Sequence, residues 1–266
     1  EVRYMIRVNT ETCIGCGMCE KDCLASAIRV EDGKAKVKMK CMECGHCVAV
    51  CPVGAVTMDG AYDMADVMPY DAETFKVPAE NFLNFLKFRR STRQYQQKAV
   101  EQEKLERVVE AGRYTPTASN GQNVHFVVVQ EQMERVKDLI WEGLERMLEA
   151  GEIPHYRGML QRFIDRRKAD KTQDALFFGA PVLVVLTCEG PWNGPLAARS
   201  MELMAEAEGL GSLYSGFIQR GIFYSPEVQE LLGITGEQVT VCMLMGYPAV
   251  KYRRTVPRKK ANVTWK

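Results

Sequence analysis

The cysteines of this chain are concentrated in one short segment near the N-terminus. Eight of the ten lie between residues 13 and 51, and only Cys188 and Cys242 lie beyond it. The spacing Cys-x2-Cys-x2-Cys-x3-Cys occurs twice, and each cysteine of the first run recurs 28 positions later, as 13 does at 41. The eight are Cys13, Cys16, Cys19, Cys23, Cys41, Cys44, Cys47 and Cys51. This pattern predicts an internally duplicated module that binds metal through thiolates.

The spacing suits two iron–sulfur clusters. A [4Fe–4S] cube needs four thiolates at roughly tetrahedral corners, and one tight Cys-x2-Cys-x2-Cys loop supplies three of them. The fourth cysteine of each run leads into a helix and reaches the other cluster. We therefore expect one cluster on Cys13, Cys16, Cys19 and Cys51 and the other on Cys41, Cys44, Cys47 and Cys23. The second run ends in Cys-Pro and is similar to the bacterial ferredoxin signature, whereas leucine follows the first run.

Other uses of dense cysteine fit less well. A secreted disulfide scaffold is stapled throughout its length, but here more than 200 residues follow with only two cysteines. A pair of zinc sites stays open as an alternative, although zinc pairs usually have a longer spacer and rarely need a third cysteine in one loop. Short strands at 3–8 and 56–58 and a hairpin over 27–38 complete the expected fold. Residues 1–60 are predicted to form a two-[4Fe–4S] ferredoxin domain.

The rest of the chain reads as a linker and a larger domain. Residues 61–79 contain two prolines and no clear periodicity, which indicates a connector. An apolar helix over 82–88 follows it, and a second helix is expected around 105–109. The remaining expected helices are 131–150, 156–169 and 195–208, and the expected buried strands are 126–129, 182–187 and 239–245. Strands that alternate with helices predict an α/β or α+β layer architecture.

Three polar segments of the larger domain could hold an anionic ligand. Arg89-Arg90-Ser91-Thr92-Arg93 places cations around a hydroxyl, and a guanidinium fork matches a phosphate. A small, polar segment at 115–122 lies between a helix and a strand, and a basic segment at 253–260 follows Gly-Tyr-Pro. Taken singly, a basic cluster is usually a solvated face and such a polar stretch is usually a loop.

Together and in this order, these segments resemble the nitroreductase family of FMN-dependent oxidoreductases, over roughly residues 83–266. The similarity includes Arg-Arg-Ser-x-Arg, Pro-x-Ala-Ser-Asn-x-Gln before a strand, Gly-Ala-Pro-Val-Leu-Val-Val at 179–185, and the Gly-Tyr-Pro and Pro-Arg-Lys elements. The resemblance implies a three-layer α+β domain over residues 80–266. It also implies a homodimer, with an FMN at each of two sites on the dimer interface.

The resemblance also implies which residues contact the flavin. They are Arg89, Arg90, Ser91, Arg93, Pro116, Thr117, Ala118, Asn120, Ser215, Gly216, Arg258 and Lys259. In the family pattern, 89, 91 and 93 contact the phosphate, ribityl chain and pyrimidine edge, and 116–120 reach across from the partner subunit. Residues 215 and 216 lie near the ring nitrogen N5, and 258 and 259 close the phosphate site. The chain departs from many members in having Asn123-Val124 in place of Pro-Trp, and from some in having Ser215 in place of an acid.

Composition and missing motifs exclude several classes. Thirty-five Lys and Arg against 34 Asp and Glu give a net charge of +1, so nucleic acid and anionic membranes are not expected partners. No run of about 18 apolar residues suits a membrane span. Gly209-Leu210-Gly211 lies at a predicted helix end, which favours a helix cap over a dinucleotide fingerprint. No protein nucleophile is expected, and oxygen-sensitive clusters favour a cytoplasmic location.

The leading hypothesis is an FMN-dependent oxidoreductase with a built-in ferredoxin module. Electrons would pass between clusters and flavin, and the flavin would reduce a nitroaromatic, a quinone or another electron-poor small molecule. Reduced ferredoxin or NAD(P)H is the expected external donor. An electron-transfer or docking protein, whose flavin relays charge without a substrate of its own, is the alternative. A zinc-binding interaction module is a third possibility.

Overall fold

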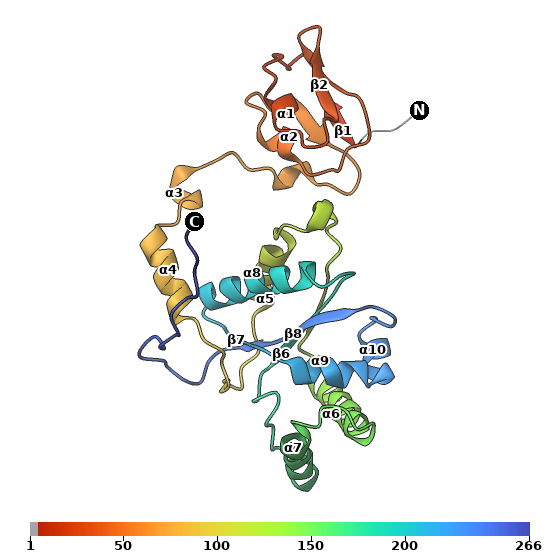
Figure 1. Ribbon diagram of the computed structural model, residues 1–266, viewed down its shortest axis with the longest axis vertical. Coiled ribbons are helices and arrows are strands. Elements are labelled where there is room, and N and C mark those ends of the chain that lie inside the picture. The colour runs from red at the N-terminus through yellow and green to blue at the C-terminus, as the bar shows by residue number, and fades with distance from the viewer. Residues whose placement is uncertain (1–4) are drawn as a thin grey trace. The chain divides into compact units, whose positions relative to one another are not determined.

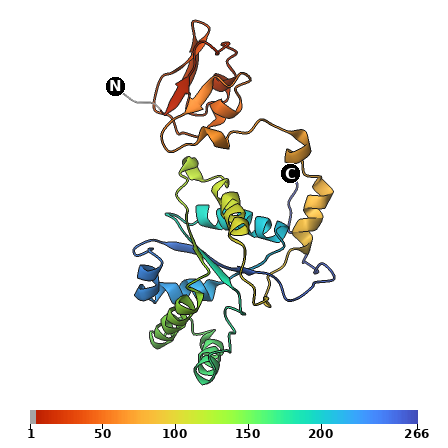
Figure 2. The same ribbon diagram turned by 180° about the vertical axis from the view of Figure 1, so that it is seen from behind.

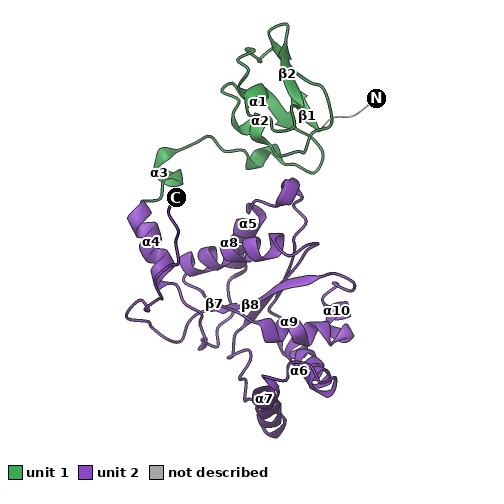
Figure 3. Cartoon of the chain, in the orientation of Figure 1, with its two compact units in different colours: residues 1–77 green, residues 78–266 purple. Residues whose placement is uncertain are grey.

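The structure is a computed structural model that describes residues 5–266. The chain divides into two compact units, residues 1–77 and 78–266 (Figure 3). The predicted strand at 3–8 is observed as β1 (Ile6–Val8), and its first two residues lie outside the described part.

The first unit contains two small antiparallel sheets. Strand β1 pairs with β4 (Val56–Met58), and β2 (Ile28–Glu31) pairs with β3 (Lys34–Val37) as the expected hairpin (Figure 1). Two single-turn helices, α1 (Met18–Lys21) and α2 (His46–Ala49), follow the two cysteine loops. The expected duplication is therefore present in the backbone, because α1 and α2 begin 28 residues apart.

Glycines shape the two cysteine loops. Gly17 and Gly45 precede α1 and α2 with φ angles of 76° and 72°, a region that side-chain-bearing residues rarely adopt. Gly15 also has a positive φ, and a Cβ atom there would lie 2.2 Å from the carbonyl oxygen of Gly33. The first loop therefore packs directly on the β2–β3 turn, and only glycine fits at position 15.

The predicted connector is not devoid of structure. A 3-10 turn, η1 (Met64–Asp66), and a single helical turn, α3 (Ala72–Phe75), lie within it. Asp63 and Asp71 cap these turns by accepting hydrogen bonds from backbone N–H groups at 2.8 and 3.0 Å. Met64 at the start of η1 packs against the cluster of Ile6, Val56 and Met58. The side chains from 65 to 77 are exposed, so α3 is stabilised by local hydrogen bonds and not by a core.

The second unit is built on one four-stranded antiparallel sheet in the order β5-β6-β8-β7. The strands are β5 (His125–Val129), β6 (Val182–Thr187), β7 (Gly211–Tyr214) and β8 (Val239–Gly246). Three of them match the apolar runs expected from the sequence. The fourth, β7, is a short edge strand that the sequence did not predict.

Helices cover both faces of this sheet (Figures 1 and 2). Successive residues of β6 alternate between two hydrophobic clusters: Val182 and Val184 face α5 (Gln102–Arg113) and α8 (Asn193–Ala207). Leu183 and Val185 face the other cluster, with α6 (Met133–Glu149), α7 (Arg157–Ala169), α9 (Gly216–Phe223) and α10 (Pro226–Leu231). This two-residue period confirms the expected three-layer α+β fold.

Two helices cross with their backbones in contact. A Cβ atom added to Gly143 of α6 would lie 2.1 Å from the carbonyl oxygen of Gly221 in α9. A Cβ atom on Gly221 would lie 2.7 Å from the Ile140 side chain. Neither helix can carry a side chain at this crossing, so the position of α9 against α6 is set by main-chain contact.

The second unit has both buried thiols and exposed apolar side chains. Cys188 and Cys242 are buried, and Gly209 follows α8 with a φ of 76°, as expected for a helix cap. Trp192 is 73% exposed. The apolar helix α4 (Ala79–Phe88) leaves Phe82, Leu83 and Phe88 exposed as well.

Candidate functional site

The four cysteines assigned to the first cluster line one cavity. Cys13, Cys16, Cys19 and Cys51 surround it together with small and aliphatic residues such as Val30 and Ala55. Cys51 comes from the second cysteine run and the other three come from the first. The structure therefore brings together the interleaved set that the spacing predicts, in an apolar pocket suited to an iron–sulfur cube.

Backbone N–H groups point at the cysteine sulfurs. Ala27 donates to Cys23 Sγ and Ala55 donates to Cys51 Sγ, each at 3.2 Å. These two pairs are again 28 residues apart, so the duplication extends to the hydrogen bonds. Ala35 and Glu43 donate to Cys13 and Cys41 at 3.4 and 3.2 Å. Such donors stabilise thiolate charge and are one of the means by which a protein tunes a bound cluster.

The cysteine side chains are not drawn together around one point. Within residues 5–266, no group of three or more His, Cys, Asp or Glu side chains is placed to hold a single metal ion. Burial raises the pKa of the Cys47 thiol to about 11, with a smaller contribution from neighbouring Cys41. Iron bound there has to displace a proton.

In the second unit, the arginine segment runs beside β7. Ser91 forms an isolated bridge with Ser212, and the next backbone N–H, of Thr92, donates to the Ser212 carbonyl at 2.9 Å. Gly211 is necessary here, because a Cβ atom on it would lie 2.2 Å from the Thr92 hydroxyl. The segment therefore passes close to the edge of the sheet, and Arg89 and Arg90 lie just before the bridge.

Two arginines of this segment keep buried donors without partners. The Nε atoms of Arg89 and Arg90 are buried and have no hydrogen-bond partner within the described chain. An unpaired buried donor costs about 1–3 kcal/mol. The Arg90 guanidinium stacks over the Tyr252 ring at 5.2 Å, which leaves its edge available. Two unpaired guanidinium donors fit a phosphate, so these residues suit the cofactor that the family pattern implies.

The small polar segment forms a strained loop between α5 and β5. It contains the short turn η2 (Ala118–Asn120), and Ser119, Asn120 and Gln122 all have positive φ angles, between 45° and 54°. The loop is held by α8: the Asn193 side chain accepts from the Ala118 N–H at 3.1 Å and donates to Asn123 at 2.8 Å. Residues over-determined in a rare backbone region are typical of binding loops.

The two predicted segments lie at different places along α8. Asn193 holds the loop at the first residue of the helix, and Glu202 binds Arg89 nine residues later. Nine residues correspond to about 13 Å of helix. The structure thus does not gather all predicted flavin residues at one point in a single chain.

Ser215 and Gly216 occupy the start of α9. Ser215 follows β7 and caps the helix, its hydroxyl accepting from the Ile218 N–H at 3.3 Å. The N-terminal turn of a helix presents free N–H groups and a partial positive charge. These features suit the electron-rich edge of a flavin, and Ser215 takes the place where some relatives carry an acid.

The C-terminal basic residues are exposed. Arg258 and Lys259 lie on a segment without helix or strand, and their side chains are open to solvent. The start of that segment is fixed to the arginine segment, because the Tyr252 hydroxyl donates to the Ser91 carbonyl at 3.4 Å. Arg258 and Lys259 follow Tyr252 by only a few residues, but within the described chain they make no hydrogen bond or ion pair with the arginine segment.

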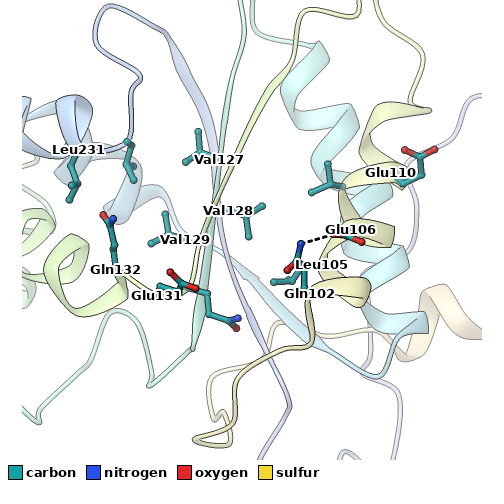
Figure 4. Close-up of a pocket in the computed structure, with 13 residues that line it drawn as sticks. Gln102, Leu105, Glu106, Glu110, Val127, Val128, Val129, Glu131, Gln132 and Leu231 are labelled. Carbon is teal, nitrogen blue, oxygen red and sulfur yellow. Dashed lines mark hydrogen bonds between the residues drawn. The ribbon is translucent and has the colours of Figure 1, made fainter. Parts of the chain in front are cut away.

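A groove of about 660 Å³ runs along the outer edge of β5 and is lined by none of the predicted flavin residues. Figure 4 shows Val127, Val128 and Val129 in the middle, between Gln132 and Leu231 on one side and α5 on the other. In α5, Gln102 donates to Glu106 at 2.8 Å. Strand β5 has one neighbour among the described strands, so its outer edge is open.

Three residues of this site were not predicted from the sequence. Glu202, Asn193 and Tyr252 each fix one of the predicted segments, yet all three come from elsewhere in the chain. A glutamate or asparagine in a helix pattern usually faces water, so only its spatial partner reveals its role. No motif around these residues could have identified them.

The comparison with known families identifies both units. The nitroreductase family model matches residues 86–247, and a 4Fe-4S dicluster domain model matches residues 12–56. Within residues 5–266, no helix combines the length and apolarity needed to cross a bilayer.

Solved structures share the fold of the second unit. A nitroreductase with bound FMN from Desulfitobacterium hafniense is 21% identical, with a TM-score of 0.55 over 68% of this chain and 97% of that one. A nitroreductase with bound FMN from Bacteroides fragilis is 23% identical, with the same TM-score and coverage. At these identities, the likeness establishes the fold.

Curated relatives match shorter pieces. One subunit of an ion-translocating oxidoreductase complex from Methanosarcina acetivorans is 51% identical over 47 residues, which are 17% of this chain and 18% of that one. One subunit of an NADH-quinone oxidoreductase from Geobacter metallireducens is 32% identical over 82 residues, 27% of this chain and 60% of that one. The chain thus spans less than two thirds of these relatives. From the family match over most of its length, the chain belongs to the nitroreductase family of flavin-dependent oxidoreductases and carries an N-terminal 4Fe-4S dicluster domain.

Proposed function

We propose that this protein is an FMN-dependent oxidoreductase that exchanges single electrons between two [4Fe–4S] clusters and a flavin. The flavin would pass electron pairs to a nitroaromatic, a quinone or another electron-poor small molecule. Residues 1–60 would form the cluster domain, 61–79 the linker and 80–266 the flavin domain. The observation that carries the proposal is the pairing, in one chain, of a four-cysteine cavity with the buried, unpartnered donors of Arg89 and Arg90.

The residues of the chain have distinct tasks in this proposal. Bound flavin supplies hydride and single-electron chemistry, as the cofactor does in such enzymes. Arg89 and Arg90 bind the anionic phosphate, assisted by Arg258 and Lys259 when the C-terminal segment closes over it. Arg93 stabilises negative charge at the pyrimidine edge, and Ser91 donates to the ribityl chain. The α9 N-terminus at Ser215 and Gly216 positions the ring.

A homodimer is part of the proposal. The loop residues Pro116, Thr117, Ala118 and Asn120 would complete the flavin site of the partner subunit, as in the family pattern. Two observations support an additional copy: the exposed apolar side chains of α4, and the open edge of β5 with its groove. Unpaired strand edges and exposed apolar faces in soluble proteins commonly mark association surfaces.

The clusters suggest the donor. Reduced ferredoxin delivers one electron at a time, which suits a cluster module, whereas NAD(P)H delivers a hydride to the flavin directly. We favour entry through the clusters, and NAD(P)H remains the competing donor. A cytoplasmic location belongs to the same proposal, because oxygen-sensitive clusters and reduced thiols persist there.

The first test is the cofactor content of the anaerobically purified protein. We expect an absorbance spectrum with both flavin and iron–sulfur bands, and about eight irons, eight sulfides and one FMN per chain. Flavin without iron, in protein kept anaerobic, would remove the cluster half of the proposal. Zinc without flavin would overturn the proposal altogether.

A second test separates an enzyme from a relay. Cys13→Ser and Cys41→Ser should each abolish cluster-dependent turnover but leave reduction of the flavin by a nicotinamide or by dithionite intact. Cys188→Ser is the matched control, since Cys188 is a buried cysteine outside the cluster unit. Loss of every activity in the cluster variants, with flavin still bound, would favour the relay protein without a substrate of its own.

A further inference from the structure

A carboxylate is buried beside the arginine segment. Glu202 lies in α8 and is 2% exposed. Arg89 donates from Nη1 to Glu202 Oε1 at 2.6 Å, although the two residues are 113 positions apart in the chain. Arg199 donates to the second carboxylate oxygen, and the Tyr214 hydroxyl lies 3.4 Å from that same oxygen. One buried negative charge therefore serves two guanidinium groups.

The bond to Glu202 uses only part of the Arg89 side chain. A guanidinium carries five N–H donors in a rigid planar fork, so fixing one nitrogen fixes the direction of the others. The Nε donor of Arg89 stays buried and unpartnered within residues 5–266. The carboxylate thus leaves a fixed, unsatisfied edge on the arginine that begins the predicted flavin segment.

Stability alone is a weak explanation for this arrangement. Replacing a buried ion pair by apolar residues of similar volume is often neutral or stabilising. The pair is also incomplete, because a partner for Nε is missing and an unpaired donor is unfavourable. Both facts are explained if a ligand oxygen completes the set, and an anionic oxygen suits two guanidinium groups that share the one carboxylate of Glu202.

We propose that Glu202 is a positioning residue for flavin binding: it holds the Arg89 guanidinium so that its remaining donors meet the phosphate of FMN. This inference rests on the proposed function. Glu202 acts through Arg89 and does not touch the cofactor itself. Tyr214, whose pKa is raised by burial and by the nearby Glu202 charge, stays neutral, and its hydroxyl donates to the Ala198 carbonyl at 2.9 Å, with Glu202 the more distant acceptor at 3.4 Å.

The test is flavin titration of the full-length chain after removal of its flavin, followed by fluorescence quenching. FMN and riboflavin are compared, because riboflavin lacks the phosphate. In Glu202→Gln, one acceptor oxygen faces two guanidinium groups, and the new amide N–H2 repels one of them. We expect FMN affinity to fall roughly tenfold, the equivalent of one charge-assisted hydrogen bond, and riboflavin affinity to stay unchanged.

A matched control separates orientation from charge. Glu206 lies one turn further along α8 and is half-buried; burial raises its pKa, and Arg89 acts on it in the opposite direction. It makes no hydrogen bond to Arg89 among the described residues. Glu206→Gln therefore removes a similar charge without removing the contact, and it should leave the FMN affinity within about twofold of the starting protein.

A double-mutant cycle decides whether Glu202 acts through Arg89. In an Arg89→Ala background, Glu202→Gln should have no further effect on FMN affinity. An effect that persists there, or equal losses for FMN and riboflavin, would overturn the positioning role. If Glu202→Gln does not fold, Glu202→Gln/Arg199→Gln leaves the local net charge unchanged and carries the same test. A wild-type chain that binds neither flavin would instead contradict the proposed function.

Discussion

The two units of this chain stabilise themselves in different ways. In residues 5–77, no helix exceeds four residues, and the buried clusters are small: one combines Ala35 and Ala55 with cysteines, and the other is centred on Ile6, Val56 and Met58. In residues 78–266, large aliphatic and aromatic side chains such as Leu183 and Phe177 fill both faces of a sheet. One unit surrounds a metal site, and the other surrounds a hydrocarbon core.

This contrast bears on which cofactor is structural. A unit of this size buries little apolar surface, so we expect metal binding to supply part of its folding free energy. The larger unit has a complete core without flavin, so its cofactor acts as a ligand that adds to a fold already formed. Four predictions test this contrast.

Iron removal should reveal the difference in stability between the two units most clearly. After anaerobic chelation, we expect residues 5–77 to lose their cooperative melting transition, while the transition of residues 78–266 stays within a few degrees of its original temperature. Differential scanning calorimetry with iron analysis measures both. Two unchanged transitions in iron-free protein would show that the small unit has a core sufficient by itself.

A side chain at the α6–α9 crossing should affect only the larger unit. Gly143→Ala places a methyl group against the Gly221 carbonyl, and we expect a loss of about 1–3 kcal/mol in its unfolding free energy. Gly158→Ala is the control: its Cβ would meet only the Arg162 side chain at 3.8 Å, so a helix-stabilising gain of up to about 1 kcal/mol is expected. Denaturant unfolding compares the two variants. A change in unfolding free energy of the same sign in both would contradict the close backbone contact at Gly143.

Phosphate binding by the C-terminal segment should depend on position and not on charge alone. Arg258→Ala should weaken FMN retention by about 1.5–3 kcal/mol, because a charge-assisted hydrogen bond is lost. Arg254→Ala removes the same exposed charge four residues earlier and should change retention by less than about 1 kcal/mol. Flavin content after gel filtration and a titration of each variant give the answer. Equal losses of FMN affinity in the two variants would indicate nonspecific charge attraction and contradict a specific role for Arg258.

The smallest effect is a pH dependence confined to the larger unit. The Arg146 side chain, with a contribution from the Glu227 backbone, lowers the pKa of Glu227 from 4.5 to about 2. Because the folded-state pKa is depressed, the stabilisation is present above pH 4.5 and is lost as the pH falls towards about 2. Glu227→Gln should therefore melt slightly below the starting protein near pH 6, and the gap should close with acidification. A difference in melting temperature that stays constant with pH would contradict stabilisation by the ionised Glu227 carboxylate.

Much of the architecture followed from local patterns. The helix expected at 131–150 is observed at 133–149, and the apolar runs at 182–187 and 239–245 are strands, because buried elements of this length carry a strong periodic signal. The cysteine spacing predicted both loops and the set of four sulfurs around one cavity. These features depend on neighbours that are close in sequence.

What the sequence did not predict depends on distant partners. Strand β7, only Gly-Ser-Leu-Tyr, is a strand because β8 and Ser91 flank it. Glu202 reads as a solvated helix residue until Arg89 is placed beside it. The exposure of α4 could not be foreseen either, since its apolar pattern is typical of a buried helix. Hydrophobic periodicity carries no information on contacts between distant residues, so it cannot identify the residues that position a site.

The interleaving of the cysteines limits how the small unit can be divided. Cys51 lines the same cavity as three cysteines of the first run, so the two repeats do not correspond to two separable halves. A gene fragment that encodes either repeat alone would supply only three of the four thiolates for one cluster, and its fourth cysteine would have no cluster to bind. We therefore expect the module to bind its metal only as a whole, even though its sequence is a tandem copy.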